Sequence, residues 1–173
     1  MRAELERNYF ELFGLVPDFA VDVALLAERY RALQRQFHPD RFAHAADAER
    51  RLAVQVAAHL NEAHQTLRDP MRRGRYLLQL TGVDTQEETD TVMDPEFLME
   101  QMSLRERLEA AGEASRDLQA LADELETRYE RQLSDLSAAF AAHDYTTARA
   151  RVRELQFLGK VRDEIATRQE AQA

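Results

Sequence analysis

The sequence predicts an all-α protein made of two helical units, and three observations support this. The 173 residues include only five Gly and four Pro, which are too few turn residues for a chain of many short strands. Apolar residues recur at spacings of three and four, and no segment alternates as a strand does. Residues 1–80 hold 12 basic and 11 acidic side chains (+1), whereas residues 81–173 hold 11 basic and 21 acidic (−10). Such an asymmetry predicts two units with different partners.

The first predicted unit, residues 1–81, has two short and two long helices. Three of them begin after a residue whose side chain can accept hydrogen bonds from the free amides of the first turn. These residues are Asn8, Asp22 and Asp69. Gly14 and Gly82 end the first and the last helix, and Pro39 ends the second, because the residue before a proline is forced out of the helical conformation. A loop is expected over 38–46. The predicted helices are 9–13, 23–37, 47–67 and 70–81.

A polar, acidic stretch over 82–93 has no helical period and is predicted to be a linker. The second unit, residues 94–173, is expected to form a three-helix bundle. Asp94 is a cap followed by a proline at the first helical position, Ser115 begins the second helix, and Asp144 caps the third. Each helix has an apolar stripe at helical spacing. The stripes include Leu104 and Leu108, then Leu118, Leu121 and Leu125, then Val152, Leu155 and Leu158.

The strongest motif is His-Pro-Asp at residues 38–40, where an arginine-rich helix ends. Pro39 fixes φ and interrupts the helix, so His38 and Asp40 are expected to point outward. The arginines offer charge-assisted contacts to an acidic partner surface. The predicted contact residues are His38, Pro39, Asp40, Arg29, Arg31, Arg35 and Arg41. The alternative is purely local: Pro39 only breaks the helix, His38 caps it and Asp40 pairs with Arg41.

A basic helix that runs into His-Pro-Asp resembles the J-domain, the module with which co-chaperones stimulate ATP hydrolysis by DnaK-type chaperones. Over nearly the whole chain, further motifs resemble the HscB family, the J-type co-chaperones of iron–sulfur cluster biogenesis. These motifs are NYFELFGL (8–15), HPDRF (38–42), QTLRDP (65–70), RYLL (75–78), FLMEQ (97–101) and RELQFL (153–158). The resemblance implies a C-terminal bundle that binds the cluster scaffold protein IscU, and a J-domain that hands IscU to the specialised chaperone HscA. It also implies the bacterial form, because no cysteine-rich segment precedes the J-domain.

Helical geometry predicts where the second unit binds. At ~100° per residue, Leu98, Met99 and Met102 lie away from the stripe that should form the core, on a face that should contact water. Large apolar side chains on such a face indicate a partner site, and methionine suits an adaptable one. The HscB resemblance places the scaffold site on the same helix. The predicted scaffold-binding residues are Leu98, Met99, Met102, Arg105, Glu106 and Phe157. The alternative is that this face packs on the J-domain or on a neighbouring helix.

Several classes of function are excluded or disfavoured. The absence of cysteine excludes disulfides, thiolate nucleophiles and Cys-ligated metals. No phosphate-binding glycine loop, catalytic serine motif or histidine spacing typical of a metal site is present, so we expect no metal, no cofactor and no enzyme activity. The acidity disfavours nucleic acid, and no apolar run approaches the ~20 residues that span a membrane, so we expect a cytoplasmic protein. A co-chaperone, a generic J-domain adaptor for another client, and a structural protein with a fortuitous His-Pro-Asp remain.

Overall fold

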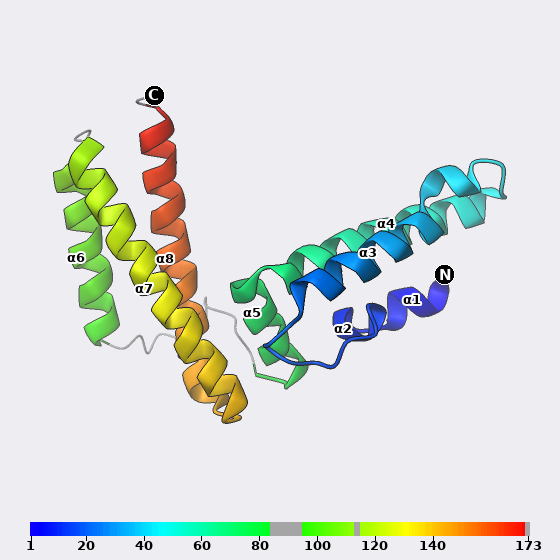
Figure 1. The fold of residues 1–173 in the computed structure, drawn as a ribbon, viewed down its shortest axis with the longest axis horizontal. Helices are drawn as coiled ribbons and strands as arrows, with labels where there is room; N and C mark the ends of the chain where they lie inside the picture. The colour runs from blue at the N-terminus through cyan, green and yellow to red at the C-terminus, as the bar shows by residue number, and fades with distance from the viewer. Residues whose placement is uncertain (84–94, 113–114, 172–173) are drawn as a thin grey trace. The chain divides into compact units, whose positions relative to one another are not determined.

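The structure is a computed structural model, which describes residues 1–83, 95–112 and 115–171 (Figure 1). The described residues form helices and no strand, which confirms the all-α prediction. The chain divides into two compact units, Met1–Leu77 and Leu78–Ala173. This division falls inside the helix that was expected to close the first unit. Most of the predicted linker, residues 84–93, lies outside the described residues.

In the first unit, the two longest helices run antiparallel and side by side, and two short N-terminal helices pack on the second of them (Figure 1). The elements are α1 (Arg2–Glu6), α2 (Tyr9–Leu12), α3 (Val23–Phe37), the 3-10 helix η1 (Pro39–Phe42), α4 (Asp47–Arg68) and α5 (Pro70–Leu80). The four predicted helices are present. Helix α1 and η1 were not predicted, because α1 buries no side chain and η1 is a single short turn in the expected loop.

The N-terminal caps of the first unit form as the side chains predict, whereas the predicted cap Asp94 lies outside the described residues. Asn8 makes a reciprocal capping box with Glu11: Asn8 Oδ1 accepts from the Glu11 amide at 2.9 Å, and the Asn8 amide donates to Glu11 Oε2 at 3.1 Å. Asp22 Oδ1 accepts from the amides of Ala24 and Leu25 at 2.9 and 3.0 Å. Each cap satisfies first-turn amides that have no partner within the helix.

Aromatic contacts join the helices of the first unit. The rings of Tyr9 and Tyr76 stack with centroids 4.3 Å apart, and the Tyr9 amide donates to the Tyr76 hydroxyl at 3.0 Å, so α2 is fixed to α5. The rings of Tyr30 and His64 stack at 4.1 Å between α3 and α4, and the Tyr30 hydroxyl donates to Asn61 Oδ1 at 2.8 Å. The side chains buried here include Phe10, Leu26, Phe37, Val56, Leu60, Ala63 and Leu67.

The turn after α2 depends on a glycine and an arginine. Gly14 has φ +60°, a left-handed conformation that side chains with a Cβ disfavour. Arg29 Nη1 donates to the carbonyl oxygens of Phe13 and Gly14, both at 2.6 Å. A Cβ at Gly14 would lie 2.5 Å from that nitrogen. The turn therefore needs glycine for its backbone conformation and for the close approach of Arg29.

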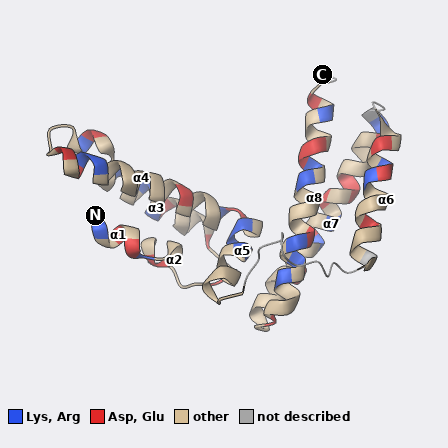
Figure 2. Cartoon of the chain, turned by 180° about the vertical axis from the view of Figure 1, so that it is seen from behind, with Lys and Arg blue, Asp and Glu red and all other residues tan. Residues whose placement is uncertain are grey.

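The second unit contains three helices that share one apolar core: α6 (Pro95–Ala111), α7 (Ser115–Ala141) and α8 (Tyr145–Glu170). Helices α7 and α8 run antiparallel (Figure 1). The core cluster consists of Leu104, Leu108, Ala111, Leu118, Leu121, Leu125, Leu158, Val161 and Ile165. Asp144 caps α8, because its Oδ1 accepts from the Thr147 amide at 3.0 Å. Acidic and basic residues alternate along the outer faces of these helices (Figure 2).

A first prediction concerns Gly14. We expect Gly14→Ala to lower the free energy of unfolding by about 2–4 kcal/mol, because the side chain adds left-handed strain and displaces Arg29. Gly82→Ala is the matched control: Gly82 has φ +79° and no heavy atom within 4 Å of a built Cβ, so we expect a loss of about 1 kcal/mol from strain alone. Urea unfolding followed by circular dichroism measures both. Equal losses would show that the Arg29 contact does not matter.

A second prediction concerns pH. Burial, followed by the charge of Arg68, lowers the pKa of His64 below its ordinary value of 6.5. The unfolded chain therefore binds a proton more readily than the folded one, and stability falls as the pH drops below about 6.5. His64→Phe keeps a ring against Tyr30 but does not titrate. We measure the free energy of unfolding by urea titration between pH 7.5 and 5.5, roughly one unit either side of the ordinary histidine pKa of 6.5. As the pH falls, the parent should lose stability relative to His64→Phe. Equal pH dependence of the two free energies would contradict this.

Candidate functional sites

The first candidate site is the exit of α3. His38 is the last residue before η1, with an extended backbone (φ −60°, ψ 129°), and Pro39 occupies the first position of η1. The side chain of His38 is 51% exposed and that of Asp40 is 90% exposed. The proline thus ends α3 and begins a tight turn, and both polar side chains point into solvent.

One ring nitrogen of His38 is engaged within the turn. His38 Nδ1 accepts from the Asp40 amide at 3.3 Å and lies 3.5 Å from Asp40 Oδ2. Since Nδ1 accepts, neutral His38 carries its proton on Nε2. The motif therefore presents an N–H donor and a carboxylate to a partner. The structure shows two features of the local alternative: α3 ends before Pro39, and His38, the C-cap residue of α3, caps η1 through its side chain.

The arginines predicted around this motif have different environments. Arg31 and Arg35 are exposed on α3, one turn apart. Arg41 Nη1 donates to the Arg35 carbonyl at 3.3 Å, so Arg41 also holds η1 against the end of α3. Arg29 is only partly exposed, and its guanidinium is bound to the turn after α2. Arg29 thus stabilises the fold and stands apart from the exposed arginines.

The second candidate site is the α6 surface, which we define as the exposed side chains of Leu98, Met99 and Met102. They are 43%, 71% and 58% exposed. Leu104 and Leu108 on the other side of the helix are buried at 3% and 1%. The helical periodicity therefore assigned the two faces of α6 correctly. The neighbouring Glu106 is exposed as well.

Phe157, predicted as a scaffold-binding residue, also makes contacts within the second unit. Phe157 is half-buried and packs against the core cluster. Its ring lies edge to face with that of Phe97 on α6, with centroids 6.0 Å apart. A helical projection of α8 alone could not show this contact, because the contact depends on where α6 lies. Phe157 therefore helps to hold the start of α6 against α8.

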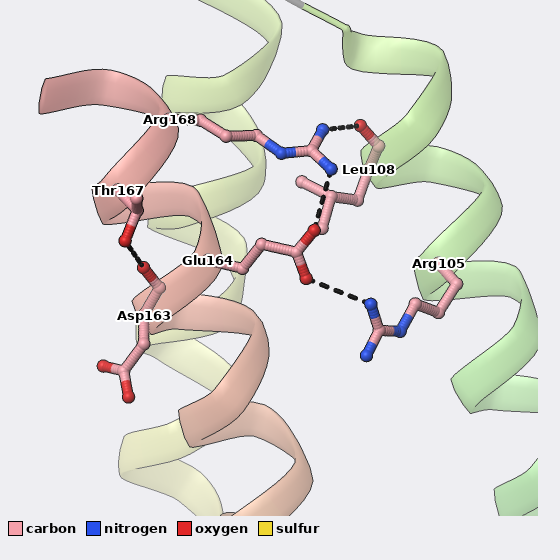
Figure 3. Close-up of polar contacts among 6 residues, drawn as sticks. All are labelled: Arg105, Leu108, Asp163, Glu164, Thr167 and Arg168. Atoms are coloured by element: carbon pink, nitrogen blue, oxygen red, sulfur yellow. Dashed lines mark hydrogen bonds and ion pairs between the residues drawn. The ribbon is translucent and has the colours of Figure 1, made fainter. Parts of the chain in front are cut away.

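Arg105, predicted as a scaffold-binding residue, also has a charged partner within the second unit. Its Nη1 lies 3.0 Å from Glu164 Oε2 on α8, and Glu164 Oε1 accepts from Arg168 Nη2 at 2.8 Å (Figure 3). Sequence reasoning did not identify Glu164 or Arg168. Their spacing of four residues is a detectable signal for a pair on one helix, but their contact with α6 is a property of the tertiary structure.

Other ion pairs join the helices of the second unit. Arg107 on α6 lies 2.5 Å from Glu124 on α7, and this hydrogen-bonded pair lowers the pKa of Glu124. Arg128 on α7 pairs with Glu100 on α6. These pairs occupy the polar faces of the bundle, so part of the acidity of this unit is neutralised within it.

Within the described ranges, no three His, Asp or Glu side chains come together as metal ligands would. The same part of the chain has no helix with the length and apolarity needed to cross a bilayer. Both sites present exposed surfaces suited to binding proteins.

Comparisons with known proteins agree with this geometry. The family model described as the HSCB C-terminal oligomerisation domain matches residues 93–166. A co-chaperone protein HscB homolog from Cupriavidus taiwanensis is 48% identical over 163 residues, which are 93% of each chain. One from Vibrio cholerae is 43% identical over 161 residues, which cover 91% of this chain and 94% of that protein. The chain belongs to the HscB co-chaperone family.

Solved HscB structures have the same fold. The chaperone HscB from Vibrio cholerae superposes with a TM-score of 0.85 at 40% identity, covering 96% of this chain and all of that one. The human co-chaperone protein HscB superposes with a TM-score of 0.88 at 31% identity, covering 94% of this chain and 82% of that one. Both comparisons include the two units. Membership of the HscB family makes this chain a co-chaperone and implies a chaperone as its partner.

Proposed function

We propose that this HscB-family co-chaperone stimulates ATP hydrolysis by a DnaK-type chaperone, HscA, and delivers the iron–sulfur scaffold protein IscU to it. One observation carries the proposal: two separate units each expose one surface suited to a protein partner. The first unit exposes His38 and Asp40 at the end of a basic helix, and the second exposes the α6 surface.

The chemistry of the first site suits an acidic partner surface that also contains a cation. Arg31 and Arg35 supply charges that steer association and that salt screens. Asp40 offers a free carboxylate that can accept charge-assisted hydrogen bonds. The capped turn keeps the motif ordered before binding, which lowers the entropy cost of association. Contact with the chaperone here would couple docking to the chaperone's own ATPase.

The chemistry of the α6 surface suits an apolar partner surface. Complete burial of one leucine or methionine side chain contributes about 1.5–3 kcal/mol, so three such residues can support a specific complex. Methionine adapts its shape to the partner. The chain has no cysteine, so in this proposal the cluster stays on the ligands of the scaffold while the co-chaperone holds the scaffold protein.

A second candidate function is self-association through the second unit. The family model that matches residues 93–166 is described as an oligomerisation domain, and the exposed α6 surface lies in that range. A generic J-domain adaptor could use the same surface for another client. Self-association would be favoured if the sedimentation coefficient rises with concentration for the parent and does not rise for Leu98→Ala.

We place the protein in the cytoplasm, where a scaffold and a DnaK-type chaperone meet.

A third prediction tests the chaperone site. We expect His38→Ala or Asp40→Ala to abolish stimulation of the HscA ATPase, because each removes one of the two groups that the turn presents. Circular dichroism should stay unchanged, since both side chains are exposed. His44→Ala is the control: His44 is exposed in the same connection outside the motif, and this variant should stimulate normally. Retained stimulation by both motif variants would contradict the chaperone site.

A fourth prediction tests the scaffold site. We expect Leu98→Ala together with Met102→Ala to weaken IscU binding by more than about 1 kcal/mol in titration calorimetry, as the loss of central apolar contacts does. Binding to the chaperone should not change. Val54→Ala removes an apolar residue of similar exposure (54%) from α4 and should leave IscU binding as it is. Unchanged affinity in the double variant would remove the α6 surface from the proposal.

A further inference from the structure

One carboxylate on α8, that of Glu164, makes two charged contacts, one with α6 and one within α8 (Figure 3). Glu164 Oε2 lies 3.0 Å from Arg105 Nη1 on α6. Glu164 Oε1 accepts from Arg168 Nη2 at 2.8 Å, and Arg168 Nη1 donates to the Leu108 carbonyl at 3.0 Å. Both oxygens of Glu164 and two nitrogens of Arg168 are therefore used to connect α8 with α6.

The contact with Leu108 acts on the C-terminal end of α6. The helix ends at Ala111, so the Leu108 carbonyl is one of the last four, which lack a partner within an α-helix. The guanidinium of Arg168 satisfies it and places a positive charge where the helix dipole is negative. An ordinary cap comes from the same helix, but this one comes from α8 and fixes the end of α6 to a neighbour.

The contact with Arg105 acts on the face of α6 that carries the proposed scaffold site. Arg105 follows Leu98 by seven residues, so the two lie within ~20° of each other around the helix. Arg105 thus continues the stripe of Leu98 and Met102 by one turn. Its side chain turns toward α8, and the pair with Glu164 holds this flank of α6.

Apolar burial holds mainly the C-terminal half of α6. Among the side chains of α6 that the structure describes, the buried ones are Leu104, Leu108 and Ala111, all in that half, whereas Phe97 near the start is half-buried. Apolar burial is non-directional, but the hydrogen bonds of Glu164 and Arg168 have defined directions. The face that α6 presents depends on these polar contacts.

We propose that Glu164 and Arg168 are positioning residues for the α6 surface, and that Arg105 contributes to partner binding through them rather than by contacting the partner. The inference rests on the proposed function of this surface. The side chains of Arg105, Glu164 and Arg168 are about one-third to one-half exposed, so each ion pair contributes only modestly to the free energy of unfolding. We expect losses of about three- to tenfold in affinity when the network is broken.

A double-mutant cycle on the full chain tests the proposal. The affinity for purified IscU is measured by titration calorimetry for the parent, Arg105→Gln, Glu164→Gln and the double variant. If Arg105 acts through Glu164, each single variant loses about three- to tenfold and the double variant loses no more than either. Two results would overturn the proposal and show that Arg105 contacts the partner. One is that Glu164→Gln binds IscU as tightly as the parent does. The other is that Arg105→Gln weakens IscU binding by the same factor in the parent and in Glu164→Gln.

Hydrogen exchange without a partner supplies an independent readout and a matched control. Amides of α6 around Leu98 and Met102 should exchange faster in Glu164→Gln than in the parent. The matched control is Glu124→Gln, which breaks the comparable pair with Arg107; Arg107 lies ~180° from Leu98 around the helix. This variant should leave both the IscU affinity and the exchange of amides around Leu98 and Met102 unchanged. If IscU does not bind the parent, the proposed function fails, but the exchange result still decides the positioning role. Unchanged exchange in Glu164→Gln would overturn it.

Discussion

Each long helix of this chain buries one stripe of side chains, and both candidate sites lie on faces that those stripes leave exposed. In the first unit α3 packs on α4, so Arg31 and Arg35 face solvent, and the exposed His38 follows the last residue of α3. In the second unit the core side of α6 packs against α7 and α8, so Leu98 and its neighbours remain exposed. Burial of the stripes supplies the stability, and the remaining faces are free for partners.

Charge performs different tasks in the two units. The first half is nearly neutral, with exposed arginines on α3, one of which lies a single turn before the motif. The second half has a net charge of −10, and part of this charge is paired across helices. Arginines on adjacent helices pair with Glu100, Glu124, Glu126 and Glu164. Arg162, for example, lies 2.5 Å from Glu126 and over the ring of Tyr129. Such contacts set the spacing and rotation of helices whose apolar stripes would tolerate small shifts.

Three side chains, those of Arg29, Arg105 and Phe157, show how far the sequence could be interpreted. Arg31, Arg35 and Arg29 all belong to a basic helix, but only the structure shows that Arg29 bonds to the turn after α2. Arg105 lies on the predicted face of α6, as periodicity indicates, but its partner Glu164 is 59 residues away. Phe157 was predicted as a scaffold-binding residue, and its ring also packs edge to face on that of Phe97. In each case the sequence did not show a contact between elements, because helical periodicity describes one element at a time.

The sequence by itself determined the helices other than α1 and η1, the caps at Asn8, Asp22, Asp69 and Asp144, the exposed His-Pro-Asp turn and the apolar face of α6. These follow from local hydrogen bonding and from the 3.6-residue period. The motifs also indicated the family to which the chain belongs. Only the tertiary structure decided which charged side chains face a partner and which join helices. That choice depends on distances between residues far apart in the sequence, and long side chains such as arginine can reach either solvent or a neighbouring helix.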